Sequence, residues 1–285
     1  MLNSEIPWAR IAAIWAELAT APVNAPDEAL HHLFDLICEL TRADDAICVV
    51  ALRSLPSADW DTDPLHGWRW MHTFRYDDRH DVTFANFWSQ DPKNTIHSRV
   101  LQKAVEGFGS HRALLKNDVI GDAPWSESRV GPLFTHYGIK DRITAAYSLS
   151  SDIEVFFTVD RKKSARPFGE KERDILLATL PGLGPICLRL AMSFGFVGSK
   201  MKLTPRERET LIHLLDKKSE KEIADEMGLT VRSAHQYVVS IYRKFEVNSR
   251  AELMALWMST PPMRQTRDDV ARLASLDEDS EGISG

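Results

Sequence analysis

Between residues 204 and 252, a hydroxyl residue repeatedly stands three positions before a glutamate at the start of an apolar helical pattern. The pairs are Thr204 with Glu207, Ser219 with Glu222, and Ser249 with Glu252. In such a capping box, the hydroxyl oxygen and the carboxylate each accept a hydrogen bond from an amide that the helix leaves unpaired. This spacing restricts the segment to short helices with sharply defined starts.

Further start and stop signals divide the segment into separate helices. Pro205 suits the first position of a helix, Gly228 can take the left-handed conformation that ends one, and Thr230 can cap the next. The predicted helices cover about 205–215, 219–227, 230–245 and 249–258. Because only a short turn beginning at Gly228 separates the second from the third, this pair has the connection of a helix-turn-helix.

The third predicted helix has two different faces. At about 100° per residue, a narrow apolar stripe that must face a core contains Ala234, Val238, Ile241 and Phe245. The opposite face contains Arg232, Gln236, Val239 and Arg243, with His235 at its edge. Cations, amides and small apolar groups contact phosphates, purine edges and the thymine methyl in a major groove. A solvated helix face has a similar mixture, so this pattern alone leaves both interpretations open.

Residues 203–258 resemble the LuxR-type (GerE-type) helix-turn-helix domain. The segment "LTPRERE" opens it, "SEKEIADEMGLT" supplies the scaffold and turn, and "VVSIYRKFEVNSRAEL" closes it. The resemblance implies a bacterial regulator that binds double-stranded DNA through the third helix and often dimerises through the fourth. Positions that usually read DNA in such proteins are occupied by Arg232, His235, Gln236 and Val239. The candidates for phosphate contacts are Lys218, Tyr237, Arg243 and Lys244.

Three positions depart from the family pattern. His235 stands where lysine is common, Tyr237 where histidine is common, and Glu246 where glycine is common after the helix. Residues 200–260 carry 11 Lys and Arg against 9 Asp and Glu, a net charge of +2 (11 − 9), whereas the whole chain carries −6. Since phosphate neutralisation supplies much of DNA affinity, we expect weaker electrostatic binding than is usual for the family.

The first 195 residues predict a separate α+β domain. Helical patterns cover about 8–20, 27–41, 82–89, 94–106, 125–137 and 168–194, and strand patterns cover 46–54, 67–75, 142–150 and 153–161. A two-residue interval, Ser151–Asp152, suits a hairpin between the last two strands. The economical assembly is an antiparallel sheet flanked by helices, as in a PAS or GAF-type sensor that also mediates dimerisation. We expect a linker at 196–202, the helix-turn-helix domain at 203–260 and an acidic, disordered tail at 261–285.

The strand at 67–75 suggests where such a domain would bind a signal. By the period of two in a strand, its aromatic face contains Trp68, Trp70, His72 and Phe74. This face is either ordinary core or part of a ligand pocket, because such pockets are mostly apolar and aromatic. The further candidates for a pocket are Trp88, Asp91 and Trp125.

The same region loosely resembles the autoinducer-binding domain of quorum-sensing regulators. Asp91–Pro92, the strand segment "HYGIKDRITAAYSL" and a closing helix occur in the family's order. The resemblance makes an acyl-homoserine lactone one candidate ligand. An orphan sensor and a purely structural dimerisation domain are the alternatives.

Other chemistries have little support in the sequence. Cys38, Cys48 and Cys187 lack paired spacing, which favours reduced thiols and a cytoplasmic protein. The histidines lack metal-ligand spacing, and no phosphate-binding glycine loop or nucleophile motif occurs. No stretch approaches the roughly 20 apolar residues of a membrane span. We therefore predict no metal, no cofactor, no membrane partner and no enzymatic activity.

Two functions remain open from the sequence. In the first, the chain is a homodimeric, sequence-specific transcription regulator, controlled by a small-molecule signal or partner at its N-terminal domain and acting on RNA polymerase. In the second, it is an interaction protein that heterodimerises with a related regulator and titrates it, without itself reading DNA.

Overall fold

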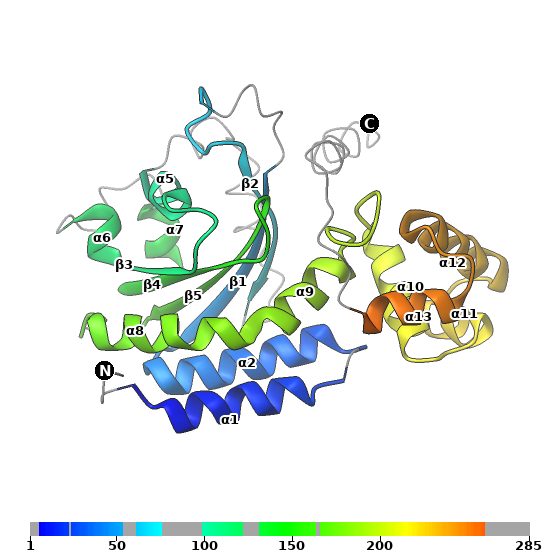
Figure 1. Cartoon of the computed structure of the whole chain (residues 1–285), viewed down its shortest axis with the longest axis horizontal. Helices are drawn as coiled ribbons and strands as arrows, with labels where there is room; N and C mark the ends of the chain where they lie inside the picture. Colours follow the sequence, from blue (N-terminus) through cyan, green and yellow to red (C-terminus); the bar gives the residue numbers. More distant parts are fainter. Residues whose placement is uncertain are drawn as a thin grey trace. The chain divides into compact units, whose positions relative to one another are not determined.

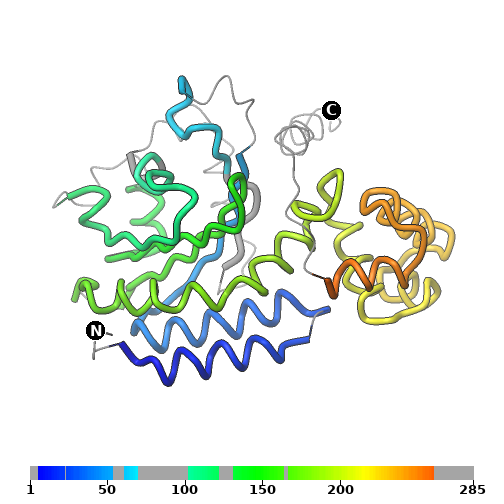
Figure 2. The backbone as a smooth tube through the Cα atoms, in the orientation of Figure 1, coloured from blue at the N-terminus to red at the C-terminus, as the bar shows by residue number. Residues whose placement is uncertain are grey.

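The computed structural model describes residues 6–22, 24–53, 61–75, 99–121, 131–163 and 166–259. The chain falls into two compact units (Figures 1 and 2). The first comprises Met1–Leu18 and His31–Gly184, and the second comprises Ala19–Leu30 and the chain from Pro185 onward. This division falls after Gly184, whereas the sequence predicts that the N-terminal domain ends at residue 195. The predicted domain boundary stays a prediction.

The first unit is built on an antiparallel sheet with the strand order β2-β1-β5-β4-β3 (Figure 1). The strands are β1 (Asp45–Arg53), β2 (Trp68–Arg75), β3 (Arg112–Leu115), β4 (Asp141–Ser148) and β5 (Ile153–Arg161). Every residue of β1 and β5 is buried, and these two strands lie in the interior of a sheet that has helices on both faces. The α+β fold and the predicted strands are confirmed, whereas the sequence did not predict β3.

Helices lie on both faces of this sheet (Figures 1 and 2). On one face, α1 (Trp8–Ala19), α2 (Pro26–Thr41) and α8 (Glu170–Thr179) pack together through Ile11, Leu40 and Ile175. The other helices of this unit are α5 (Arg99–Val105), α6 (Lys116–Ile120) and α7 (Gly131–His136). The predicted helix at 82–89 lies outside the described residues, as does part of each predicted helix at 94–106 and 125–137.

The long helix predicted at 168–194 is interrupted. A 3-10 turn, η3 (Leu180–Leu183), separates α8 from α9 (Gly184–Ser193). Pro181 has no amide to donate within a continuous helix. At Gly182, a Cβ atom would lie only 2.2 Å from the indole of Trp15, whose Nε1 donates to the Thr179 carbonyl at 2.9 Å. The prediction of one continuous helix was therefore wrong in this turn.

Contrary to the expectation from the sequence, the segment Glu170–Ser193 is long and apolar enough, by length and composition alone, to cross a membrane. Leu176, Leu180, Leu183 and Leu190 are each at most 1% exposed. Such burial is characteristic of a core helix, and the interruption at η3 agrees with that interpretation.

The β4–β5 hairpin is confirmed, but its turn is longer than the two residues predicted. The turn runs from Leu149 to Asp152, and the amides of Leu149 and Ser150 both donate to the Ile153 carbonyl, at 3.0 and 3.1 Å. β4 therefore ends at Ser148, two residues before its predicted end, whereas β5 has the predicted bounds.

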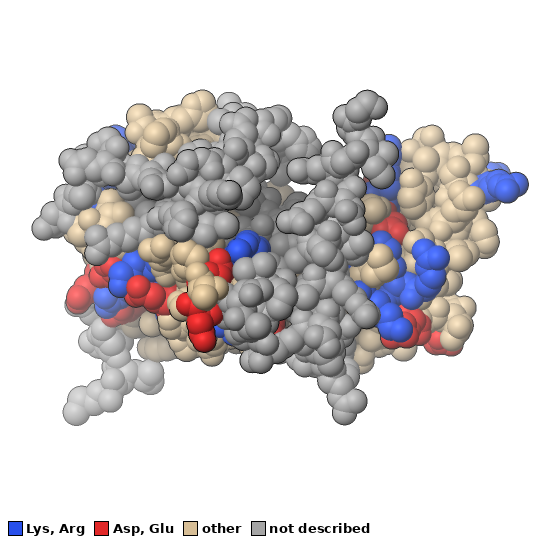
Figure 3. Space-filling view, turned by 90° about the horizontal axis from the view of Figure 1, so that it is seen from above, with Lys and Arg blue, Asp and Glu red and all other residues tan. Residues whose placement is uncertain are grey.

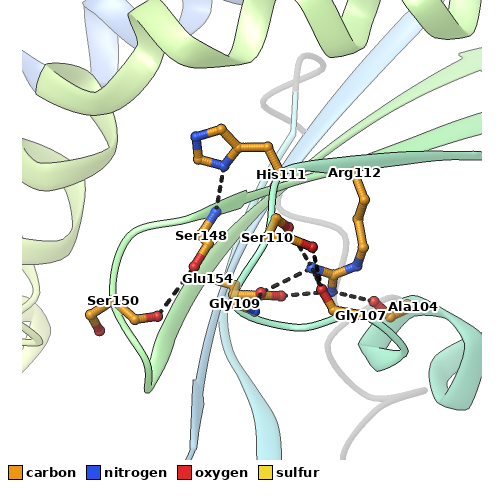
Figure 4. Close-up of polar contacts among 9 residues, drawn as sticks. All are labelled: Ala104, Gly107, Gly109, Ser110, His111, Arg112, Ser148, Ser150 and Glu154. Atoms are coloured by element: carbon orange, nitrogen blue, oxygen red, sulfur yellow. Dashed lines mark hydrogen bonds and ion pairs between the residues drawn. The ribbon is translucent and has the colours of Figure 1, made fainter.

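A buried ion pair attaches β3 and the loop before it to β5 (Figure 4). Arg112 donates to both carboxylate oxygens of Glu154, at 2.9 and 2.7 Å, and to the Ala104 carbonyl at 2.6 Å. The Gly109 amide also donates to Glu154, which is fully buried. Since a buried carboxylate requires such partners, this cluster accounts for the position of the short strand that the sequence did not reveal.

The pairing of β1 with β2 is irregular. Val50 pairs with His72, but the next residue, Ala51, pairs with Trp70, so the register shifts by one residue. This β-bulge interrupts the period of two. The side chains of Trp70, His72 and Phe74 are not described, so their sharing of one face with Trp68 stays a prediction.

The second unit contains the predicted helix-turn-helix segment. Its helices are α10 (Pro205–Leu215), α11 (Glu220–Met227), α12 (Val231–Phe245) and α13 (Arg250–Met258). Thr204 and Ser219 form the expected capping boxes. At the third start, Ser249 accepts from the Glu252 amide, whereas the Glu252 carboxylate accepts from the Asn248 amide at 2.7 Å.

Residues 194–203 form an ordered turn against the end of α12. The Lys200 amide donates to the Lys244 carbonyl at 2.9 Å, and the Leu203 amide donates to the Phe194 carbonyl at 2.8 Å. Phe196 is only 3% exposed. The predicted linker is thus bonded to the helical segment that follows it, and the acidic tail predicted at 261–285 lies outside the described residues.

Candidate nucleic-acid interface

The turn between α11 and α12 fixes the orientation of α12. Gly228, with φ of 64°, ends α11 in the left-handed region that glycine adopts without strain. Thr230 caps α12 by accepting a hydrogen bond from the Ser233 amide at 3.1 Å. The buried side of α12 consists of Ala234, Val238, Ile241 and Phe245, each at most 4% exposed. The opposite side of α12 is therefore held toward the solvent.

Most of the predicted reading residues form one exposed face of α12. This face contains Arg232, His235, Gln236, Val239 and Arg243. At about 100° and 1.5 Å per residue, it covers roughly 100° of rotation and about 17 Å of length. A major groove about 12 Å wide admits an α-helix. The exposed face therefore has dimensions that a major groove can accommodate.

Two arginines on this face are available to an anion. Within the described residues, neither Arg232 nor Arg243 forms an ion pair, whereas the exposed Arg206 of α10 pairs with Glu209 at 3.0 Å. Lys and Arg side chains occur at separate places on the visible surface of this unit, at the right of Figure 3, with Asp and Glu beside several of them. Unpaired cations on a helix that faces solvent favour a phosphate-bearing partner.

His235 has an acidic neighbour. Its Nδ1 lies 3.1 Å from a carboxylate oxygen of Glu220, at the start of α11. This carboxylate reduces the positive potential at the edge of the exposed face. The contact agrees in direction with the weaker electrostatic affinity that the sequence predicts.

Lys244, a candidate for a phosphate contact, lies away from the exposed face. It is 9% exposed, and its ammonium donates to the Glu207 carboxylate at 2.7 Å and to the Lys202 carbonyl at 2.8 Å. Burial opposes ionisation of Glu207, but hydrogen bonds from Lys244, Ser240 and Thr204 outweigh it and lower the pKa of Glu207. Lys244 thus links α12 to α10, and we leave it out of the proposed interface.

Lys218 and Tyr237 are less available than the two arginines. The ammonium of Lys218 pairs with Glu226 and with Asp216, and its hydrogen bond to Glu226 raises the pKa of Lys218. Tyr237 is half-buried on α12. Both remain predicted phosphate contacts, but Lys218 would have to exchange its ion pairs to reach DNA.

The family model GerE, described as "Bacterial regulatory proteins, luxR family", matches residues 201–257. These residues are a LuxR-family domain. The LuxR-family domain includes all of α10, α11 and α12, and therefore the whole exposed face described above.

The LuxR-family domain is also similar to part of a probable HTH-type transcriptional regulator, GfsR, from Streptomyces halstedii. The two chains are 36% identical over 61 residues, which are 21% of this chain and 25% of that relative. The chain therefore matches about a quarter of the relative's length. This match does not establish the activity and partners of the whole protein, which are proposed below.

Two solved structures of SdiA align with most of the chain. SdiA in complex with octanoyl-rac-glycerol is 14% identical, with a TM-score of 0.47 over 90% of this chain and 96% of SdiA. A crystal structure of Escherichia coli SdiA is 15% identical, with a TM-score of 0.46 over 87% of this chain and 95% of SdiA. The function proposed below does not depend on this likeness.

Val231 is an exposed residue of the LuxR-family domain that the sequence interpretation missed. It occupies the first position of α12 and is 49% exposed. At about 100° per residue, it lies roughly 40° from His235 and about 20° from the buried Val238, between the exposed face and the buried side of α12. Helical projection alone therefore does not mark it as exposed.

Outside the LuxR-family domain, Trp68 is the ligand-site candidate whose side chain the structure describes. Trp68 is fully buried, and within the described residues its Nε1 has no hydrogen-bond partner. The ring centres of Trp68 and Phe108 are 6.1 Å apart. The guanidinium of Arg53 lies 3.9 Å from the centre of the same Phe108 ring. Trp70 and His72 belong to β2, but their side chains are not described. Trp88, Asp91 and Trp125 lie outside the described residues.

Proposed function

We propose that this chain is a cytoplasmic transcription regulator that recognises specific double-stranded DNA sequences through α12. It acts as a homodimer and, through contact with RNA polymerase, changes transcription in response to a small molecule bound by its N-terminal α+β domain. The exposed face of α12, within a LuxR-family domain, supports DNA recognition. The buried Nε1 of Trp68, which has no hydrogen-bond partner within the described residues, supports the signal site.

The pair Arg232 and Arg243 carries the first part of this proposal. Both are exposed, and within the described residues both lack carboxylate partners. Two exposed cations on this helix can contact phosphates, which favours DNA reading over titration of a related regulator. Beside them, Gln236 can form the paired hydrogen bonds that select adenine. The two arginines can position the helix on phosphates, and the adjacent amide of Gln236 can read a base edge.

The test is a selection of DNA sites by the full-length protein from a random library, followed by fluorescence anisotropy across a salt series. Arg232→Ala should weaken binding to the selected site by about 1–3 kcal/mol and affect random DNA less. Arg243→Ala should weaken binding to all sequences and lower the salt dependence by about one ion. The matched control is Arg206→Ala, which removes an exposed arginine of α10 that already pairs with Glu209.

Arg206→Ala should leave unchanged both the ratio of the affinities for selected and random DNA and the salt dependence of binding. If no selected sequence binds saturably at low salt, the protein is not a DNA reader. If Arg232→Ala weakens selected and random DNA equally, Arg232 is a phosphate contact, and sequence recognition must come from other residues.

The buried donor of Trp68 carries the second part of the proposal. A buried N–H without a partner costs free energy that a ligand oxygen could recover. The core around Trp68 includes the small residues Ala51, Ala104 and Ala146. A ligand with an apolar body and at least one carbonyl acceptor would suit this environment.

The signal site is tested with a medium-chain acyl-homoserine lactone as the probe. The melting temperature of the full-length protein should rise with probe concentration, because a ligand that binds only the folded state stabilises it. Trp68→Phe keeps the aromatic volume but removes the donor, so the shift should become smaller. An equal shift in both proteins would remove Trp68 from the site. No shift in either would exclude this ligand class.

A further inference from the structure

The imidazole of His235 contacts a carboxylate through only one of its two ring nitrogens. Its Nδ1 lies 3.2 Å from Oε1 and 3.1 Å from Oε2 of Glu220, the first residue of α11. Within the described residues, Nε2 has no hydrogen-bond partner, and the His235 side chain is 60% exposed. The two ring nitrogens are therefore in different surroundings.

The Glu220 carboxylate determines which ring nitrogen of His235 carries the hydrogen. An ionised carboxylate offers only acceptors, so the nitrogen that faces it must be the donor. A neutral imidazole has a hydrogen on one nitrogen only, whereas both nitrogens of the imidazolium are donors. Uptake of a proton by His235 therefore changes the exposed Nε2 from an acceptor into a donor and adds a positive charge.

His235 lies at one edge of the exposed face of α12. At about 100° per residue, it is roughly 60° from Arg232 and 100° from Gln236 in helical projection. When a helix enters a major groove, the edges of its exposed face lie nearest the groove walls, which carry the phosphates. Phosphate oxygens accept hydrogen bonds and donate none. They would therefore bind the imidazolium Nε2 and repel the neutral one.

The charged neighbours of His235 come from the helices that surround it. Arg232, one turn earlier on α12, stays charged at every relevant pH. On α11, Glu220 is the charged side chain in contact with the imidazole. On α10, Glu207 bonds instead to Lys244 within the described residues. His235 is thus the member of the exposed face whose charge changes between pH 5 and 8.

We propose that His235 is a proton-gated phosphate contact, so that DNA binding tightens as the pH falls through the neutral range. Glu220 is the positioning residue, because it keeps the hydrogen on Nδ1 and leaves the neutral Nε2 unable to donate. This inference rests on the proposed DNA binding and specifies how the exposed face is regulated. DNA favours the protonated form, so binding takes up a proton and the affinity rises with proton concentration.

The experiment measures fluorescence anisotropy of DNA with the full-length protein at about pH 6 and about pH 8, across a salt series. Both the library-selected site and random DNA are titrated, since every sequence carries phosphates. The wild-type protein should bind both about fivefold more tightly at the lower pH, as one added contact between unit charges predicts. Its salt dependence should increase there by about one ion.

Two substitutions at His235 fix its charge. His235→Lys is charged at both pH values and should bind tightly at both, whereas His235→Gln is neutral and should bind weakly at both. Both variants should fold, because lysine and glutamine are good helix formers and the position is exposed. The matched control is His213→Gln, which removes the other histidine of the LuxR-family domain and should retain the pH effect.

The role of Glu220 is tested with Glu220→Gln. An amide can donate to Nδ1 as well as accept from it, so the hydrogen of the neutral ring can move to Nε2. The affinity at about pH 8 should rise, and the difference between the two pH values should shrink. Nitrogen NMR of the histidines should show hydrogen on Nδ1 of neutral His235 in the wild type and on both nitrogens in part in the variant.

The outcomes separate this inference from the function on which it rests. Saturable binding with equal affinity at both pH values overturns the proton-gated contact and leaves DNA recognition standing. A pH effect that persists in His235→Gln belongs to another group and also overturns it. An effect confined to the selected site would place Nε2 on a base and overturn the phosphate contact, and an unchanged effect in Glu220→Gln would overturn the role of Glu220. Failure to bind DNA at either pH would overturn the inference and the proposed function together.

Discussion

Lys244 on α12 donates a hydrogen bond to Glu207 on α10, with Nζ and Oε2 2.7 Å apart and both side chains at least nine-tenths buried. The same carboxylate accepts from the Thr204 amide at 2.7 Å and from the Ser240 hydroxyl at 2.6 Å. One side chain therefore caps α10 and holds α12 against it. This contact holds α12 in position, although neither Lys244 nor Glu207 belongs to the exposed face.

Removing Glu207 should destabilise the LuxR-family domain strongly. Glu207→Ala leaves the Lys244 ammonium buried without a carboxylate, and breaking such a pair costs about 3–5 kcal/mol. Lys244→Met should cost less, because Glu207 keeps its hydrogen bonds from Thr204 and Ser240. Urea unfolding of the full-length variants measures both effects. If the double variant loses the sum of the two single losses, the ion pair makes no coupled contribution.

The Glu207 contribution should disappear at acid pH. Because the pKa of Glu207 is lowered from its ordinary value of 4.5 in the folded protein, ionisation stabilises the fold above that value. This stability is lost as the pH falls through the lower, folded-state pKa. The difference in unfolding free energy between wild type and Glu207→Gln should therefore narrow below about pH 4.5. A constant difference from neutral to acid pH would contradict this prediction.

Glu246→Gly should stabilise the end of α12. Glu246 has a φ of 56°, in the left-handed region, which costs a side chain roughly 1–2 kcal/mol that glycine avoids. Its ion pair with Lys200 is exposed and contributes little. Thermal unfolding should show a higher melting temperature for Glu246→Gly. The matched variant Glu246→Ala loses the same ion pair but keeps the backbone strain, so it should show no gain.

Gly182→Ala should destabilise the first unit. The added Cβ would lie 2.2 Å from the indole of Trp15, and relief of such overpacking costs about 1–3 kcal/mol. Combining it with Trp15→Phe, which shortens the ring system, should cost less than the sum of the two single changes. Additive losses would show that Gly182 is required for a reason other than its contact with Trp15.

The helices of the LuxR-family domain could be predicted closely because their boundaries are set locally. Thr204 and Glu207 are three residues apart, and Gly228 ends α11 through its own backbone conformation. By contrast, β3 is a four-residue strand whose position depends on Arg112 reaching Glu154, 42 residues away. A contact between residues so far apart produces no periodic pattern near β3, so the sequence could not predict this strand.

The candidate site also combines features that follow from local sequence with features that depend on distant residues. The exposed positions of Arg232, Gln236 and Val239 follow from helical periodicity around a buried stripe. The burial of Lys244 does not, because its partner Glu207 lies 37 residues earlier in the chain. Pro181 lies inside the stretch 168–194 that the apolar pattern predicts as one helix, and the 3-10 turn Leu180–Leu183 contains it.

The ordered turn at 194–203 bears on where the LuxR-family domain could be joined to another chain. A recombination joint at residue 203 would separate Lys200 from the Lys244 carbonyl that it caps, and Leu203 from Phe194. The transplanted helices would then begin with an unsupported end on the very helix that carries the exposed face. A joint before Ala191, whose carbonyl accepts from the Phe196 amide, would transfer the turn intact. We therefore expect a transplanted helix-turn-helix segment to keep its stability only if the transferred chain begins within α9.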